Sequence, residues 1–301
     1  MLLNAEPMRC SPAIKAAGVD PIGSAGGRTS FLVVDHPLPW GKDVGDEAAL
    51  APIHAALRDA PGPWRLQATV PDPSGPRRAV RYRLPDGPFS GYERRAVEAA
   101  PDELVAAAVD LVDADGADDD GGDLLVCTHG RRDACCGSSG TTFWQDLVVR
   151  PDLVPHGTRI ARTSHTGGHR FAPTAIVLPQ GTCWAWLDVA VMFHVFARDV
   201  GFDHVAEHYR GCTALATVEE QVAERAVALE VGWSWFDRPR SGSIADRDGN
   251  DAVVELTDGE GVWQVRTRQV GTSPVPTCPG LLDEAPKSAP VVEVVGVART
   301  A

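Results

Sequence analysis

Three cysteines, a histidine and two arginines lie within one short segment, VCTHGRRDACCG, which begins at Val126. Its thiols belong to Cys127, Cys135 and Cys136. Such a group can consist of buried thiols, redox thiols or ligands to a metal, and the partner residues must come from elsewhere in the chain.

A second segment, SHTGGHRFAP, supplies two imidazoles. His165 and His169 are four residues apart, a spacing at which both rings can bind one metal. Thr166 stands where zinc proteases with this spacing have a glutamate base, and the two following glycines disfavour a helix. The pattern therefore predicts a glycine-shaped loop and argues against metalloprotease chemistry.

Two cysteines and two histidines make a Cys₂His₂ donor set, which suits tetrahedral zinc or a [2Fe–2S] cluster of mixed ligation. A Rieske centre is excluded because the chain contains no C-x-x-H. A zinc finger fits poorly, since Cys127 and Cys136 are nine residues apart and Cys135 is adjacent to Cys136. Both the zinc and the iron–sulfur alternatives stay open on the residues alone.

The segments VCTHGRRDACCGSSG, SHTGGHRFAPTAIVLPQGTCWAWLD and YRG resemble the sucrase/ferredoxin-like family over about residues 124–211. Its fungal relatives are thioredoxin-like ferredoxins with a bis-histidinyl, non-Rieske [2Fe–2S] cluster. The resemblance implies cluster ligands at Cys127, Cys136, His165 and His169; Cys136 fits the family spacing better than Cys135. No acid/base pair of carboxylates supports the glycosidase that the family name suggests.

Such a ligand set has a consequence for the redox potential. Two ferric ions, two sulfides, two thiolates and two neutral imidazoles carry no net charge, so the centre is easier to reduce than an all-cysteine one. The second ring nitrogen of an imidazole can exchange a proton, which makes the potential depend on pH. We therefore expect an electron carrier of relatively high potential rather than a self-contained enzyme, with no catalytic residue assigned.

Several charged and polar side chains flank the expected ligands and are candidates for ligand support or partner docking. The arginines form an expected positive rim for an acidic redox partner, unless they pair with acidic residues of the first unit. His129 and His156 could support the ligands, and Cys135 could pair with a released Cys136. These candidates are His129, Arg131, Arg132, Asp133, Cys135, Arg159, Arg162 and Arg170. The other cysteines, expected to be separate core or surface thiols, are Cys10, Cys183, Cys212 and Cys278.

The 301-residue chain has a net charge of −13, which argues against binding nucleic acid or an anionic membrane. Seven cysteines are too few for a disulfide scaffold, and the first residues show no export signal. The most apolar window, 183–196, is too short to span a bilayer. We expect a cytoplasmic protein.

Strand and helix patterns alternate along the chain and predict an α/β fold. We expect an N-terminal α/β unit (1–118), for which a thioredoxin-like fold is one alternative, a thioredoxin-like ferredoxin domain (124–212), and a small C-terminal helix and β appendage (213–301). Residues 92–114 read as helical, and the segment between the helix 217–232 and the strand pattern that begins at Asp251 reads as a polar loop. Two other functions remain open: a zinc-stabilised interaction module, and a thiol–disulfide oxidoreductase, which lacks the usual C-x-x-C.

Overall fold

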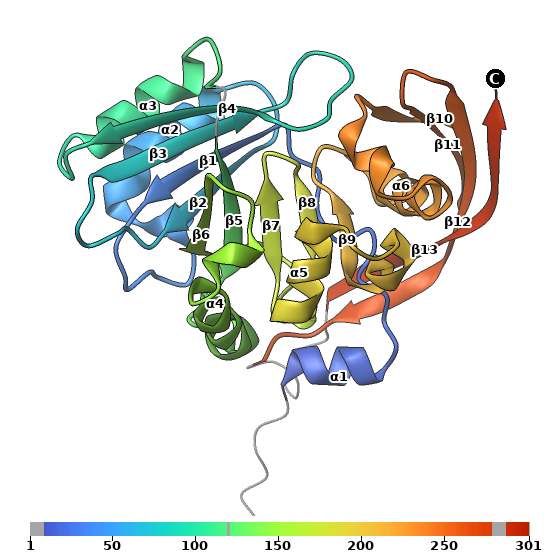
Figure 1. The fold of residues 1–301 in the computed structure, drawn as a ribbon, viewed down its shortest axis with the longest axis horizontal. Helices are drawn as coiled ribbons and strands as arrows, with labels where there is room; N and C mark the ends of the chain where they lie inside the picture. Colours follow the sequence, from blue (N-terminus) through green and yellow to red (C-terminus); the bar gives the residue numbers. More distant parts are fainter. Residues whose placement is uncertain (1–8, 119–120, 279–286, 301) are drawn as a thin grey trace, which may run out of the picture.

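The computed structural model describes residues 9–118, 121–278 and 287–300, whose elements are arranged as in Figure 1. The helices are α1 (Cys10–Ala16), α2 (Ala51–Asp59), α3 (Leu104–Asp113), α4 (Thr141–Val148), α5 (Val189–Ala197) and α6 (Val218–Val231). The strands are β1 (Ser30–Asp35), β2 (Trp64–Thr69), β3 (Arg77–Arg83), β4 (Glu93–Ala99), β5 (Gly122–Cys127), β6 (Thr158–Thr163), β7 (Ala175–Leu178), β8 (Thr182–Trp184), β9 (Tyr209–Cys212), β10 (Ser241–Asp248), β11 (Asp251–Thr257), β12 (Val262–Val275) and β13 (Lys287–Thr300).

One mixed sheet of nine strands runs in the order β4-β3-β1-β2-β6-β5-β7-β8-β9. In the first half β1 and β2 are parallel and β3 is antiparallel to both of its neighbours; in the second half β5, β6 and β7 repeat this pattern. Each half thus has the strand order of a thioredoxin-like unit, and the expected α/β fold is confirmed. The halves are joined edge to edge by β2 and β6, where Thr69 pairs with Thr163.

Alternate residues of β1 serve two different cores, as the two faces of a strand require. Leu32 and Val34 pack under α2 and α3, whereas Phe31 and Val33 belong to a cluster that also contains Leu125 of β5. The second cluster therefore holds residues from both halves of the sheet. This shared core explains why the two units pack as one body around the site.

Two sequence predictions are wrong at the edges of the sheets. Residues 93–99, read as helical, form β4, which pairs with β3 along its whole length. Residues 241–248, read as a polar loop, form β10, an edge strand whose side chains are mostly exposed. In both places cross-strand pairing overrides the intrinsic preference of the residues.

The C-terminal part forms an antiparallel sheet of order β10-β11-β12-β13 that packs against α6. Thr217 and Glu220 form a capping box that fixes the start of α6. The β12–β13 hairpin extends beyond α6, and its far end lies beside α1 (Figure 1). This hairpin carries residues near its tip to the candidate site. Among the described helices, none is long and apolar enough to cross a bilayer.

A buried ion pair ties α6 to the start of the four-stranded sheet. Glu224 is 0% and Arg240 is 1% exposed; Arg240 Nε donates to Glu224 Oε1 at 2.8 Å, and the Tyr209 hydroxyl donates to Oε2 at 2.5 Å. We expect Glu224→Ala to lower the free energy of unfolding by about 3–5 kcal/mol, because it leaves a buried guanidinium without its partner. Urea unfolding followed by circular dichroism measures this.

The matched control is Asp251→Ala, which removes the exposed ion pair to Arg268. Solvent screens that pair, so its unfolding midpoint should stay close to that of the wild type. Equal effects of the two substitutions would contradict a stabilising role for the buried pair.

Candidate metal centre

The carboxyl ends of the parallel strands β5 and β6 place a thiol and an imidazole together. Cys127 is the last residue of β5 and pairs in register with Thr163, the last residue of β6. His165 follows two residues later, and its Nδ1 lies 3.8 Å from Cys127 Sγ. Ends of neighbouring parallel strands are where sites form in α/β sheets, as this pair illustrates.

The second thiol comes from a π-helical turn, Cys136–Gly140, that leads into α4. Gly140 lies so close to the Cys127 carbonyl that a Cβ at this position would overlap it. This close approach brings the turn onto the end of β5, where Cys127 and Cys136 are both 0% exposed. One ligand atom from each of Cys127, Cys136 and His165 lies within 4.8 Å of the others, so the three residues could hold a metal.

The second imidazole lies at the other end of a glycine loop, as the sequence predicts. Gly167 and Gly168 have φ of +85° and +67°, a conformation that favours glycine. The rings of His165 and His169 are 5.5 Å apart between centroids. His169 Nε2 donates to the Pro276 carbonyl at 2.9 Å, which leaves Nδ1 as the ring nitrogen that could accept a bond.

His129 supports the backbone of this loop. Its Nε2 donates to the Gly41 carbonyl at 2.7 Å, so its Nδ1 is an acceptor and receives the His165 backbone N–H at 3.2 Å. Burial lowers the pKa of His129, which favours this neutral form. His129 therefore positions a proposed ligand through the main chain.

Two arginines that the sequence analysis did not single out hold the same loop. Arg65 donates to the His165 carbonyl, together with Gln67 at 3.3 Å. Arg210, fully buried, donates to the Gly167 carbonyl at 3.4 Å. Burial lowers the pKa of Arg65 to about 10, so it stays charged at neutral pH. Two cations beside the loop favour anionic thiolates at the site.

The thiols of the site differ in acidity. The hydrogen bond with Cys136 and the nearby His165 lower the pKa of Cys127, and the same contact raises the pKa of Cys136. Burial lowers the pKa of His169. These shifts favour a thiolate at Cys127 and a neutral imidazole at His169, which are the protonation states that bind metals.

The expected arginine rim is reduced to two exposed side chains. Arg131 is exposed and forms no ion pair with any described residue, while Arg132 lies 3.6 Å from Asp43. Arg159 instead pairs with Asp35 and Asp123, at 2.9 and 2.6 Å. Arg159 therefore pairs with an acidic residue of the N-terminal unit, Asp35, which is the alternative that the sequence analysis left open for these arginines.

The other two arginines of the expected rim, Arg162 and Arg170, pack over aromatic rings. The Arg162 guanidinium lies 5.3 Å from the centroid of the Trp144 ring and donates to Thr128 at 3.4 Å. Arg170 is buried over the ring of Phe171, 4.4 Å from its centroid. Arg162 is half-buried and Arg170 is buried, so neither belongs to an exposed rim.

Cys135 points away from Cys136 and into a second group of side chains. Its Sγ lies 3.6 Å from Cys10 Sγ and 3.2 Å from Cys278 Sγ. The expectation of separate thiols is therefore wrong for Cys10 and Cys278. Asp133, a candidate for ligand support or partner docking, is 2% exposed and belongs to this group.

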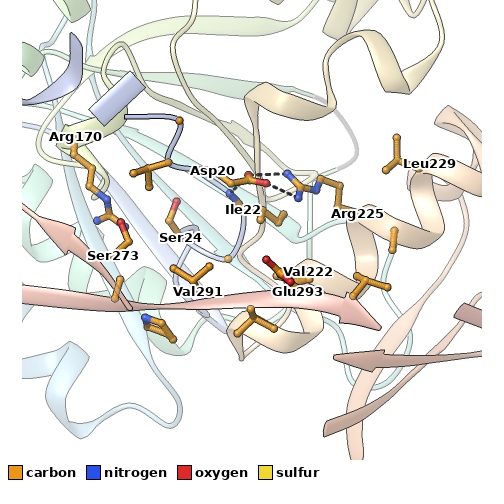
Figure 2. Close-up of a pocket in the computed structure, with 18 residues that line it drawn as sticks. Asp20, Ile22, Ser24, Arg170, Val222, Arg225, Leu229, Ser273, Val291 and Glu293 are labelled. Carbon is orange, nitrogen blue, oxygen red and sulfur yellow. Dashed lines mark hydrogen bonds and ion pairs between the residues drawn. The ribbon is translucent and has the colours of Figure 1, made fainter. Parts of the chain in front are cut away.

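A cavity of about 830 Å³ lies between α6, the segment before β1 and β13 (Figure 2). Its walls include the ion pair of Asp20 with Arg225, at 2.7 Å, and Arg170. None of Cys127, Cys136, His165 and His169 lines it. The cavity is thus separate from the candidate metal centre.

The fold and the site define an α/β protein with a buried cysteine and histidine group that could hold a metal. A family model described as sucrase/ferredoxin-like matches residues 21–225, and the chain belongs to this family. The match includes both halves of the nine-stranded sheet and most of α6. Comparison with curated proteins and with solved structures gave no match.

Proposed function

We propose that this chain is an electron-transfer protein that holds a [2Fe–2S] cluster on Cys127, Cys136, His165 and His169. The observation that carries the proposal is the convergence of two fully buried thiols and His165 at the ends of β5 and β6, with the ring of His169 5.5 Å from that of His165, in a sucrase/ferredoxin-like protein. The donor set fits the group, because thiolates and imidazoles are both known iron ligands in such clusters.

The position of His169 favours a cluster over a single zinc ion. A tetrahedral ion requires four ligand atoms around one point. Among the described residues, the atoms that converge belong to Cys127, Cys136 and His165, and His169 is outside this group. A cofactor with two metals could be held by both thiols and both imidazoles, because it does not need all four ligand atoms around one point.

The ligands set the expected redox behaviour. Mixed cysteine and histidine ligation gives potentials of about −150 to +300 mV, against about −400 mV for four cysteines. The cluster supplies one-electron chemistry when bound, and the chain holds it beside a half-buried His165 through which an electron could pass to a partner. We propose a cytoplasmic location, because thiols of this kind persist in a reducing compartment.

Electron paramagnetic resonance of anaerobically purified, dithionite-reduced protein tests the proposal. A rhombic spin-half signal with nitrogen coupling is expected, together with about two irons per chain. A colourless protein that contains zinc at this site would overturn the proposal in favour of a zinc-stabilised interaction module. Disulfide reductase activity that survives His165→Ala would instead favour a thiol–disulfide oxidoreductase.

We further propose that Arg131 and Arg132 dock an acidic redox partner, since they are exposed and lie between the two cysteine ligands in sequence. Ferricyanide, an anionic electron acceptor, can replace the partner in a stopped-flow experiment. The double substitution R131S/R132S should slow oxidation of the reduced protein by about threefold to tenfold at low salt and weaken its salt dependence.

The matched control is Arg268→Ser, which removes an exposed arginine from the four-stranded sheet. Its oxidation rate should follow the wild type at every ionic strength. An unchanged salt dependence in R131S/R132S would refute the docking role.

A further inference from the structure

A second buried group of potential ligands adjoins the proposed cluster site. It consists of Cys10, Asp133, Cys135 and Cys278, and one ligand atom from each lies within 4.8 Å of the others. Cys10 begins α1, Asp133 and Cys135 follow β5, and Cys278 lies just beyond β12. Three chain segments that are remote in sequence therefore meet at this point.

The three sulfur atoms form a nearly equilateral triangle. Cys10 Sγ is 3.6 Å from Cys135 Sγ and 3.3 Å from Cys278 Sγ, and Cys135 Sγ is 3.2 Å from Cys278 Sγ. Zinc–sulfur bonds of about 2.3 Å in a tetrahedron place sulfur atoms about 3.8 Å apart. The triangle is only slightly contracted from this value. Thiols so close to one another converge on one ion and could not occupy separate corners of a larger cluster.

The carboxylate of Asp133 completes the tetrahedron. Its Oδ1 lies 3.3 Å from Cys278 Sγ, and its Oδ2 lies 3.7 Å from Cys10 Sγ. The backbone N–H groups of Cys135 and Cys278 donate to Oδ1 and Oδ2 at 2.8 and 3.1 Å, which fixes the orientation of the carboxylate. The fourth donor is thus already in place on the open side of the triangle.

The charge of the group favours the binding of a cation. Asp133 is 2% exposed, and no described Lys or Arg forms an ion pair with it. A buried carboxylate without a cationic partner is costly, and a divalent ion coordinated by thiolates and carboxylate removes that cost. A disulfide would use only two of the thiols and would leave the third beside an uncompensated carboxylate.

We propose that Cys10, Asp133, Cys135 and Cys278 bind a structural zinc ion in tetrahedral coordination. All four positions are filled by protein, as in structural rather than catalytic zinc sites. The site stands independently of the cofactor at Cys127 and Cys136. The vicinal cysteines thereby have separate roles, with Cys136 facing the proposed cluster and Cys135 facing the zinc.

This zinc site would also support the histidine ligand of the neighbouring centre. Pro276, whose carbonyl accepts the His169 Nε2 hydrogen bond, is two residues before Cys278. Cys10 Sγ lies 3.9 Å from the His169 carbonyl. The ion would thus fasten the start of α1 and the β12–β13 hairpin over the back of the histidine loop.

Metal analysis of the full chain, purified from zinc-supplemented cells, tests the site. The wild type should carry one zinc that both Cys10→Ala and Cys278→Ala lose, whatever the first centre holds. Cys183→Ala removes a buried cysteine outside the group and should keep the zinc. Cys127→Ala should also keep it while losing iron, which separates this proposal from that of the cluster.

A second measurement leaves all four proposed zinc ligands in place. Co²⁺ added to Cys127→Ala protein freed of zinc should give the intense visible absorption of a tetrahedral thiolate site, and excess Zn²⁺ should abolish it. The proposal is overturned if the wild type contains no zinc beyond the first centre, if Cys10→Ala and Cys278→Ala both retain it, or if mass spectrometry finds a Cys135–Cys278 disulfide.

Discussion

Replacing Cys136 by alanine should abolish the iron–sulfur chromophore, whereas replacing the adjacent Cys135 should leave it largely intact. Cys136 is fully buried beside Cys127, and it is one of the two thiols that converge with His165. Cys135 faces Cys10 and Cys278 instead. Loss of a thiolate ligand leaves one iron with an open position, so iron should fall from about two per chain to nearly none in Cys136→Ala.

Visible absorption and iron content of proteins purified side by side measure this difference. The two substitutions remove the same atoms from neighbouring positions, so each serves as a control for the other. The zinc content should show the reverse pattern, with loss in Cys135→Ala and retention in Cys136→Ala. Loss of iron in Cys135→Ala with retention in Cys136→Ala would show that the ligand assignment is reversed.

The parts of this site that could be predicted from sequence are those fixed by strand ends. Cys127 closes a run of apolar residues typical of a buried strand, and His165 follows another strand pattern. Because neighbouring parallel strands end at the same edge, these two residues could be expected to meet. The paired glycines before His169 similarly predicted a loop, and both have positive φ.

The second group could not be predicted because its spacing carries no signature. Cys10 and Cys278 are 125 and 143 residues from Cys135, far beyond the short spacings that identify zinc ligands in sequence. They meet only because the β12–β13 hairpin and α1 both reach the end of β5, which depends on tertiary packing. The support of the histidine loop by Arg65 and Arg210 was hidden for the same reason.

Edge strands were the weakest part of the fold prediction. The residues of β4 include glutamates and alanines that favour a helix, yet all seven pair with β3. The pairing of β2 with β6 was equally hidden, because Thr69 and Thr163 alone pair in register and the other backbone bonds join residues beside them. Such contacts depend on which edges the completed halves leave open.

Changing the histidine ligands to cysteine should lower the redox potential of the proposed cluster. Each neutral imidazole replaced by a thiolate adds one negative charge, which disfavours the reduced state. We expect a fall of about 100 mV or more for His165→Cys, and the double variant H165C/H169C should approach the range near −400 mV of all-cysteine clusters. Spectroelectrochemical titration at pH 7 measures both values.

The pH dependence provides the discriminating readout. In the wild type, raising the pH removes a proton from an imidazole ligand more easily when the cluster is oxidised, so the potential should fall by up to about 59 mV per pH unit. Thiolate ligands have no such proton, and the potential of the double variant should be nearly independent of pH.

The control is His156→Cys, which adds a thiol at an exposed loop position and should keep the wild-type potential and its pH slope. A wild-type potential that is flat between pH 6 and 9 would contradict proton coupling, whereas an unchanged potential in both ligand variants would remove the histidines from the coordination sphere. The two results separate the question of which residues bind iron from the question of whether electron and proton move together.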